Sequence, residues 1–156
     1  MEKNVERIAS FSVDHDKIDA GIYISRIDGD VTTYDLRTRK PNAGDYMSNL
    51  TMHSTEHMFA TFIRNSAIGA DVLYFGPMGC RTGFYLLVRG RDDAAVLSAV
   101  TDTLRKIISY EGKVFGAHRR ECGNYRCLDL SSAKKECKRY LDVLNNKKEI
   151  NFRYDE

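Results

Sequence analysis

The sequence lacks a long hydrophobic run, and it lacks a marked excess of charge of either sign. Its longest unbroken apolar segment, residues 84–88, is far too short to cross a bilayer. The first residues contain no apolar stretch typical of a signal peptide, so we expect a cytoplasmic protein. The 24 basic and 22 acidic residues are interspersed and give a net charge of +2. That balance gives no argument for a nucleic-acid-binding face.

Cysteine is scarce, and its spacing excludes two common uses of the residue. The four cysteines match neither a zinc ribbon nor a Cys-x-x-Cys redox pair, and no glycine-rich dinucleotide fingerprint is present. The sequence also contains no repeat, linker or low-complexity segment. With 156 residues, 42% of them hydrophobic, we expect one domain over 1–156, in which 146–156 form a loosely held polar tail.

Apolar and β-branched residues predict about four strands. Residues 21–27 and 31–38 flank an Asp-Gly turn, which is a strong hairpin signal. Residues 71–75 and 82–88 flank a second turn that is rich in glycine. A brief alternation at residues 10–15 predicts one more short strand.

Three segments have the periodicity and end signals of helices. The first begins at the N-cap residue Ser48 and is expected to end at Gly69; the second follows residues 90–92 and is closed by Gly112. The last covers residues 131–145, after an irregular loop. Because helices and strands do not alternate strictly, we expect an α+β fold, with an antiparallel sheet of about four strands and helices packed on one face.

The first predicted helix carries the pattern His53-x-x-Glu56-His57. Residues three and four apart lie on one helix face, so these three side chains project together. Two imidazoles one turn apart bind a divalent metal, and a carboxylate beside them moves protons there. The same pattern also fits two solvated histidines and a glutamate on an amphipathic helix.

Two cysteines are candidates for chemistry. Cys80 lies in a tight turn between two predicted strands, where it is either a reactive thiol or a small core residue. Cys122 lies in a polar loop and is a suitable third ligand for the histidine pair; two histidines and one cysteine leave a tetrahedral ion one open position, as in catalytic sites. Cys127 and Cys137 are interpreted as structural, and His118 as a surface residue.

Several motifs together carry a resemblance to a known family. The chain resembles the S-ribosylhomocysteine lyase (LuxS) family over nearly its whole length. The matching motifs, in order, are Ser10-Phe11-x-Val13-Asp14-His15, Asp35-Leu36-Arg37, Pro41-Asn42, His53-x-x-Glu56-His57 with Arg64, residues 77–85 around Cys80, Glu121-Cys122-Gly123-Asn124-Tyr125, and the last helix.

The resemblance implies both an activity and a set of residue roles. The activity is cleavage of S-ribosylhomocysteine to homocysteine and 4,5-dihydroxy-2,3-pentanedione, the autoinducer-2 precursor, by a homodimer with active sites at the subunit interface. One divalent metal per subunit, ferrous iron natively, is implied. The implied ligands are His53, His57 and Cys122, the acid/base pair is Glu56 and Cys80, and the substrate contacts are Ser10, His15, Arg37 and Arg64.

The sequence departs from the family pattern at two places, and two other functions remain open. Residues 74–76 replace the Asp-Ile-Ser that is frequent in the family near the homocysteine end, and Arg39 replaces a frequent cysteine. The first alternative function is a zinc metallopeptidase with the inverted His-x-x-Glu-His motif. The second is a binding module whose structural zinc has Cys127 as its fourth ligand.

Overall fold

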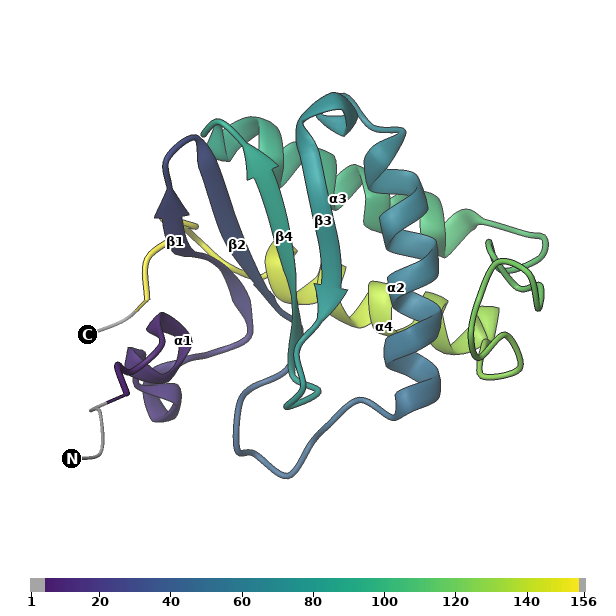
Figure 1. Cartoon of the computed structure of the whole chain (residues 1–156), viewed down its shortest axis with the longest axis horizontal. Helices are drawn as coiled ribbons and strands as arrows, with labels where there is room; N and C mark the ends of the chain where they lie inside the picture. The colour runs from purple at the N-terminus through teal and green to yellow at the C-terminus, as the bar shows by residue number, and fades with distance from the viewer. Residues whose placement is uncertain (1–4, 155–156) are drawn as a thin grey trace.

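A four-stranded antiparallel sheet organises the chain in the computed structural model, which describes residues 5–154 (Figure 1). The strands are β1 (Gly21–Asp28), β2 (Val31–Arg37), β3 (Val72–Pro77) and β4 (Gly83–Arg89). The helices are α1 (Ala9–Ser12), α2 (Asn49–Arg64), α3 (Asp93–Ser109) and α4 (Leu130–Asn145), with short 3-10 turns at His15–Lys17 and Gly69–Asp71. The α+β prediction is confirmed.

Sheet register brings the end of β2 beside the turn that joins β3 to β4. The strand order is β1-β2-β4-β3, and Arg37 of β2 is paired with Gly83 of β4. A Cβ atom at Gly83 would lie 2.7 Å from the Leu36 carbonyl oxygen, so a larger residue there would force the two strands apart. The register therefore places Arg37 next to the turn that carries Cys80.

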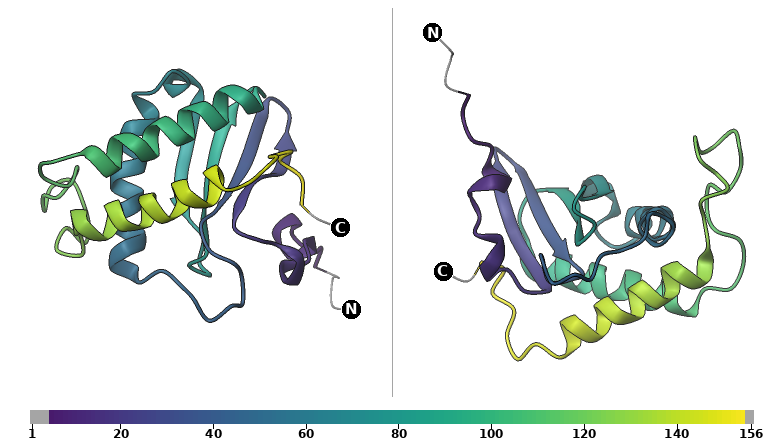
Figure 2. Two further views of the ribbon diagram at one scale, coloured as in Figure 1. Left: turned by 180° about the vertical axis from the view of Figure 1, so that it is seen from behind. Right: turned by 90° about the horizontal axis from the view of Figure 1, so that it is seen from below.

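The three long helices share one apolar core with the sheet. Helices α3 and α4 lie behind the sheet and α2 runs beside β3, as the two further views also show (Figure 2). The rings of Phe59, Phe75 and Phe84 stack in series across α2, β3 and β4, with centroids 4.4 and 5.0 Å apart. Cys137 of α4 is 1% exposed, and burial raises the pKa of its thiol, as expected of a structural cysteine. No helix within residues 5–154 is long and apolar enough to span a membrane.

Two sequence predictions, the end of the first long helix and a strand at residues 10–15, are wrong for local reasons. Helix α2 begins after Ser48, whose hydroxyl accepts from the Thr51 amide, but it ends at Arg64 and not at Gly69. The chain folds back so closely that a Cβ atom at Gly69 would lie 2.0 Å from the Arg64 carbonyl oxygen. The strand predicted at residues 10–15 is instead a helical turn followed by a 3-10 turn, where the Asp14 carboxylate accepts from the Asp16 amide.

The C-terminal tail is packed and not loosely held up to residue 154. The Ile24 amide of β1 donates to the Phe152 carbonyl at 2.8 Å, and the Phe152 side chain is 8% exposed in the core. Tyr154 reaches further and donates to the Asp35 carboxylate. These contacts attach the tail to β1 and β2. The polar sequence of the tail does not predict them.

Arg39 forms an ion pair that fastens the segment after β2 to α4. Its guanidinium donates twice to Glu136, at 3.2 and 2.7 Å, and once to Asp45. The Glu136 side chain is only 3% exposed, so its carboxylate depends on this partner for solvation. The arginine found where the family often has cysteine is thus matched by a buried acid.

Replacement of Arg39 by methionine is expected to lower the free energy of unfolding by about 3 kcal/mol, because the buried Glu136 carboxylate then loses the cation that pairs with it. Urea denaturation measures this change. The double variant Arg39→Met/Glu136→Leu is the control and should recover most of the loss, since an apolar pair of similar volume has no charge to solvate. A single variant as stable as the wild type would contradict the assigned role of the pair.

Candidate active site

The two histidines of α2 are oriented by backbone carbonyls outside the helix. His53 Nδ1 lies 2.7 Å from the Cys127 carbonyl oxygen, and His57 Nδ1 lies 2.7 Å from the Phe115 carbonyl oxygen. A carbonyl only accepts, so each Nδ1 is the protonated donor and each Nε2 is left with a free lone pair. This is the arrangement by which proteins prepare imidazoles as metal ligands.

The loop between α3 and α4 brings a thiol to the same place. This loop projects beyond α2, on the side away from the sheet (Figures 1 and 2). Cys122 Sγ lies 3.4 Å from His53 Nε2 and accepts from the Asn124 amide. The ligand atoms of His53, His57 and Cys122 all lie within 4.8 Å of one another. The chain therefore has a metal-binding group of two histidines and one cysteine.

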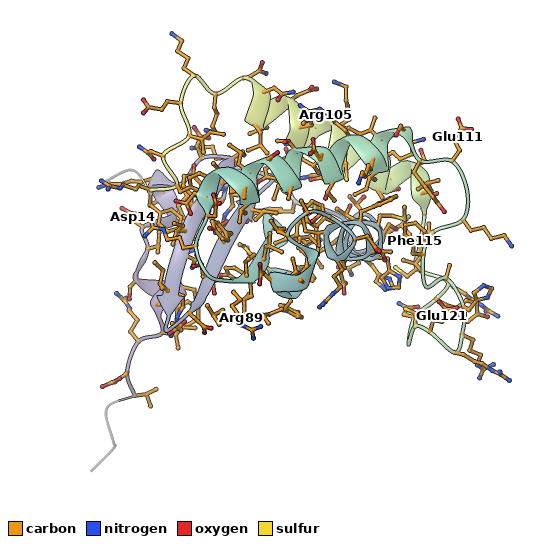
Figure 3. The ribbon with its side chains drawn as sticks, turned by 90° about the horizontal axis from the view of Figure 1, so that it is seen from above. Asp14, Arg89, Arg105, Glu111, Phe115 and Glu121 are labelled. Carbon is orange, nitrogen blue, oxygen red and sulfur yellow. The ribbon has the colours of Figure 1, made fainter. Side chains whose placement is uncertain are left out.

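Gly116 allows the loop to approach the second histidine. It has a φ of +68°, and a Cβ atom there would lie 3.1 Å from His57 Nδ1. The preceding residue is Phe115, whose carbonyl orients that imidazole; its side chain lies close to α2, whereas Glu121 is further out on the loop (Figure 3). The fit of loop to helix thus depends on a glycine in the left-handed region. Glu56 is half-buried on α2 between the two histidines.

Cys80 lies in a separate cavity at the β3–β4 turn. The cavity has a volume of about 370 Å³, and the Cys80 thiol is exposed within it. Arg81, the next residue, adopts a φ of +63°, and its amide closes a turn on the Met78 carbonyl. The cavity is lined by Ser10, Phe11, His15, Arg37, Pro77, Met78, Gly79, Cys80 and Tyr85. It therefore gathers the thiol and three of the four predicted substrate contacts.

Arg37 supplies the positive charge of this cavity. Its side chain is 3% exposed and forms two hydrogen bonds with Asp35, at 3.1 and 2.7 Å. Its Nη1 donates to Thr82 Oγ1 at 2.9 Å and lies 3.9 Å from Cys80 Sγ. Burial lowers the pKa of the guanidinium, but the Asp35 carboxylate outweighs burial and the net shift is upward. Arg37 is therefore a permanent cation beside the thiol.

The remaining predicted residues lie apart from the cavity. Arg64 is exposed at the end of α2 and donates to the backbone carbonyls of Val72 and Leu73. Tyr74 is 53% exposed on β3, and its ring lies against Gly76. His118 is exposed, as predicted. None of the metal-ligating residues lines the Cys80 cavity, so one chain contains two distinct groups of candidate residues.

Sequence reasoning did not identify the residues that orient the site. Asp35, Thr82 and Tyr85 belong to the family motifs, but the sequence gives none of them a role. The carbonyls of Phe115 and Cys127 have no signature, because a backbone atom's role does not depend on residue type. Tyr154 lies 119 positions from its partner Asp35, so no local pattern connects them.

Comparison with known proteins agrees with this arrangement. The family described as S-ribosylhomocysteinase (LuxS) matches residues 8–151. An S-ribosylhomocysteine lyase of Borreliella afzelii is 40% identical, covering 96% of this chain and 99% of that protein. An S-ribosylhomocysteine lyase of Finegoldia magna is 41% identical, covering 97% of this chain and all of that protein. With the metal-binding group and the thiol cavity both in place, the chain belongs to the LuxS family.

Proposed function

We propose that this protein is a lyase that cleaves S-ribosylhomocysteine to homocysteine and 4,5-dihydroxy-2,3-pentanedione, the precursor of autoinducer-2. The observation that carries the proposal is the group of two histidines and one cysteine formed by α2 and the loop, in a chain of this family. The decisive experiment adds S-ribosylhomocysteine to anaerobically purified protein and titrates the thiol released. Absence of homocysteine release would refute the activity.

The ligand set disfavours both alternative functions. A metallopeptidase with the inverted motif takes an acidic third ligand, whereas the third donor here is the Cys122 thiol. A structural zinc module needs the Cys127 thiol as fourth ligand, but within residues 5–154 the group contains three ligands. Cys127 contributes its backbone carbonyl, which orients His53. A set of three protein ligands is typical of catalytic centres.

His53, His57 and Cys122 would hold one divalent ion per chain, and we assign ferrous iron on the family resemblance. When bound, the ion supplies Lewis acidity that stabilises the enediolate oxygens of the sugar. The Nε2 lone pairs of both histidines and the half-buried Cys122 thiol, which lies 3.4 Å from His53 Nε2, suit such an ion.

Cys80 and Glu56 are the proposed proton carriers. Cleavage without a redox cofactor requires the sugar carbonyl to migrate along the chain until it lies β to sulfur, and protons leave and return at different carbons. Two carriers at different places serve those steps. Arg37 holds a positive charge 3.9 Å from the Cys80 sulfur, and Ser10 and His15 line the same cavity, where they would contact the ribosyl hydroxyls. Arg64 is proposed to approach the homocysteine end.

We further propose a homodimer in which one chain contributes the metal ligands and Glu56, and its partner contributes the Cys80 cavity. Within one chain these two groups line different surfaces, yet both proton carriers must reach the same substrate. Exposed apolar residues support a contact here, since Ile8 and Phe11 beside the cavity are 55% and 68% exposed. A two-fold axis would then complete two identical sites.

Metal content is expected to depend on three side chains. His53→Ala, His57→Ala and Cys122→Ala should each lose most of the bound metal, because each removes one of the three protein ligands that residues 5–154 bring together. Cys127→Ala is the matched control and should retain the metal, since it keeps the backbone carbonyl that orients His53. Elemental analysis of purified variants measures the content. Full occupancy in Cys122→Ala would refute the ligand assignment.

Turnover is expected to depend on Cys80 and Glu56 without loss of metal. Cys80→Ala and Glu56→Gln should each lower kcat by about a hundred- to ten-thousand-fold, as for a positioned general acid or base. A variant blocked at a late step should accumulate a 2- or 3-keto sugar, which carbon NMR of labelled substrate detects. Wild-type thiol release by Cys80→Ala would return Cys80 to a purely structural role.

Mixed dimers test the shared site. Co-expression of Cys80→Ala chains with His57→Ala chains should give about a quarter of wild-type activity, because half of randomly paired dimers are mixed and each has one intact site. Each variant alone should be nearly inactive, and sedimentation should show dimers in every sample. No recovery in the mixture would show that each site is built from a single chain.

A further inference from the structure

The C-terminal tail ends on the acidic partner of the cavity arginine. Tyr154 stacks on Tyr23, with ring centroids 4.9 Å apart, and its hydroxyl donates to Asp35 Oδ2 at 2.8 Å. The same oxygen accepts from Arg37 Nη2 at 2.7 Å. Asp35 is 1% exposed, so its carboxylate has protein donors in place of water. The tail follows β1 to reach this position (Figure 2).

Arg37 lies between this carboxylate and the Cys80 thiol. Asp35 holds Nε and Nη2, which fixes the plane of the guanidinium, and Nη1 faces Thr82 and Cys80. Because the guanidinium is a rigid planar fork, its two ends move together. A change in how Asp35 is held therefore changes the position of Nη1 and so the distance between its positive charge and the Cys80 sulfur.

We propose that Tyr154 is a positioning residue for the thiol cavity: through Asp35 it fixes the Arg37 guanidinium and so determines how closely that cation is held to the Cys80 sulfur. The inference rests on the proposed function, in which Cys80 carries protons. It gives residues of the C-terminal tail a part in the reaction although they do not line the cavity.

The phenol is suited to this task because it stays a neutral donor. Burial, together with the adjacent Asp35 carboxylate, raises the pKa of Tyr154 far above neutrality. Several titratable or charged side chains surround Asp35 and Cys80 and contribute to any pH dependence. Around Asp35 they are Tyr23, Arg37, Tyr85, Tyr140 and Tyr154, and around Cys80 they are His15, Arg37 and Tyr85.

The test is Tyr154→Phe, which keeps the ring stack and removes only the hydroxyl. Asp35 then has one donor fewer and attracts the Arg37 charge more strongly, away from the thiol. Alkylation of Cys80 by iodoacetamide, measured on the rising part of its rate–pH profile, should slow about threefold, which equals a displacement of that profile by about half a pH unit to higher pH. Mass spectrometry of the Cys80 peptide measures the rate, and kcat for homocysteine release should fall in parallel.

Tyr34→Phe is the matched control. Tyr34 lies on β2, and its phenol also donates to a carboxylate, Asp93 Oδ1, at 2.7 Å. This variant loses the same type of hydrogen bond and should leave the Cys80 profile unchanged. If Tyr154→Phe moved the profile no more than Tyr34→Phe, the tail would be merely structural and the proposal overturned. Alkylation of Cys80 does not require turnover. A wild-type protein that released no homocysteine would therefore refute the lyase function, whereas the rate–pH profile of alkylation would still test the role of Tyr154.

Discussion

The buried ion pair of Asp35 and Arg37 is the interaction on which the thiol cavity depends. Both side chains are buried near the C-terminal end of β2, where burial of either charge without the other would destabilise the fold. The pair also connects three distant parts of the chain, because Asp35 receives Tyr154 from the tail and Arg37 reaches Thr82 and Cys80 at the β3–β4 turn. The contacts that solvate the two buried charges thus also fix the surroundings of the Cys80 thiol.

The metal-binding group depends on one helix, α2, which both packs into the core and presents two metal ligands. One face of α2 packs Met58, Phe59 and Ile63 into the core, while another presents His53 and His57 to the loop. The loop contributes Cys122 and also the carbonyls that hold both imidazoles. Since ligand and orienting groups come from one segment, correct packing of that loop prepares the whole group.

The metal-binding group and the thiol cavity lie in different parts of the chain, and this separation is the reason for proposing a dimer. The metal-binding group lies where the loop projects from the body of the domain, and the thiol cavity lies at the N-terminal segment and the β3–β4 turn. The proposed reaction, with one metal ion and the proton carriers Glu56 and Cys80, would draw on both. Pairing of two chains is a simple way to bring them together without lengthening a domain of 156 residues.

The sequence by itself determined the elements and the residue types of the chemistry. Hairpin signals, the Ser48 cap and helical spacing predicted the sheet, α2 and the shared face of His53 and His57, because these depend on neighbours within a few residues. Family motifs identified Cys80 and Cys122. Tertiary structure alone decided that Phe115 and Cys127 orient the imidazoles through their carbonyls, that Arg39 pairs with Glu136, and that the polar tail reaches Asp35. Such contacts join residues far apart in the chain and often use backbone atoms, so no local pattern of side chains encodes them.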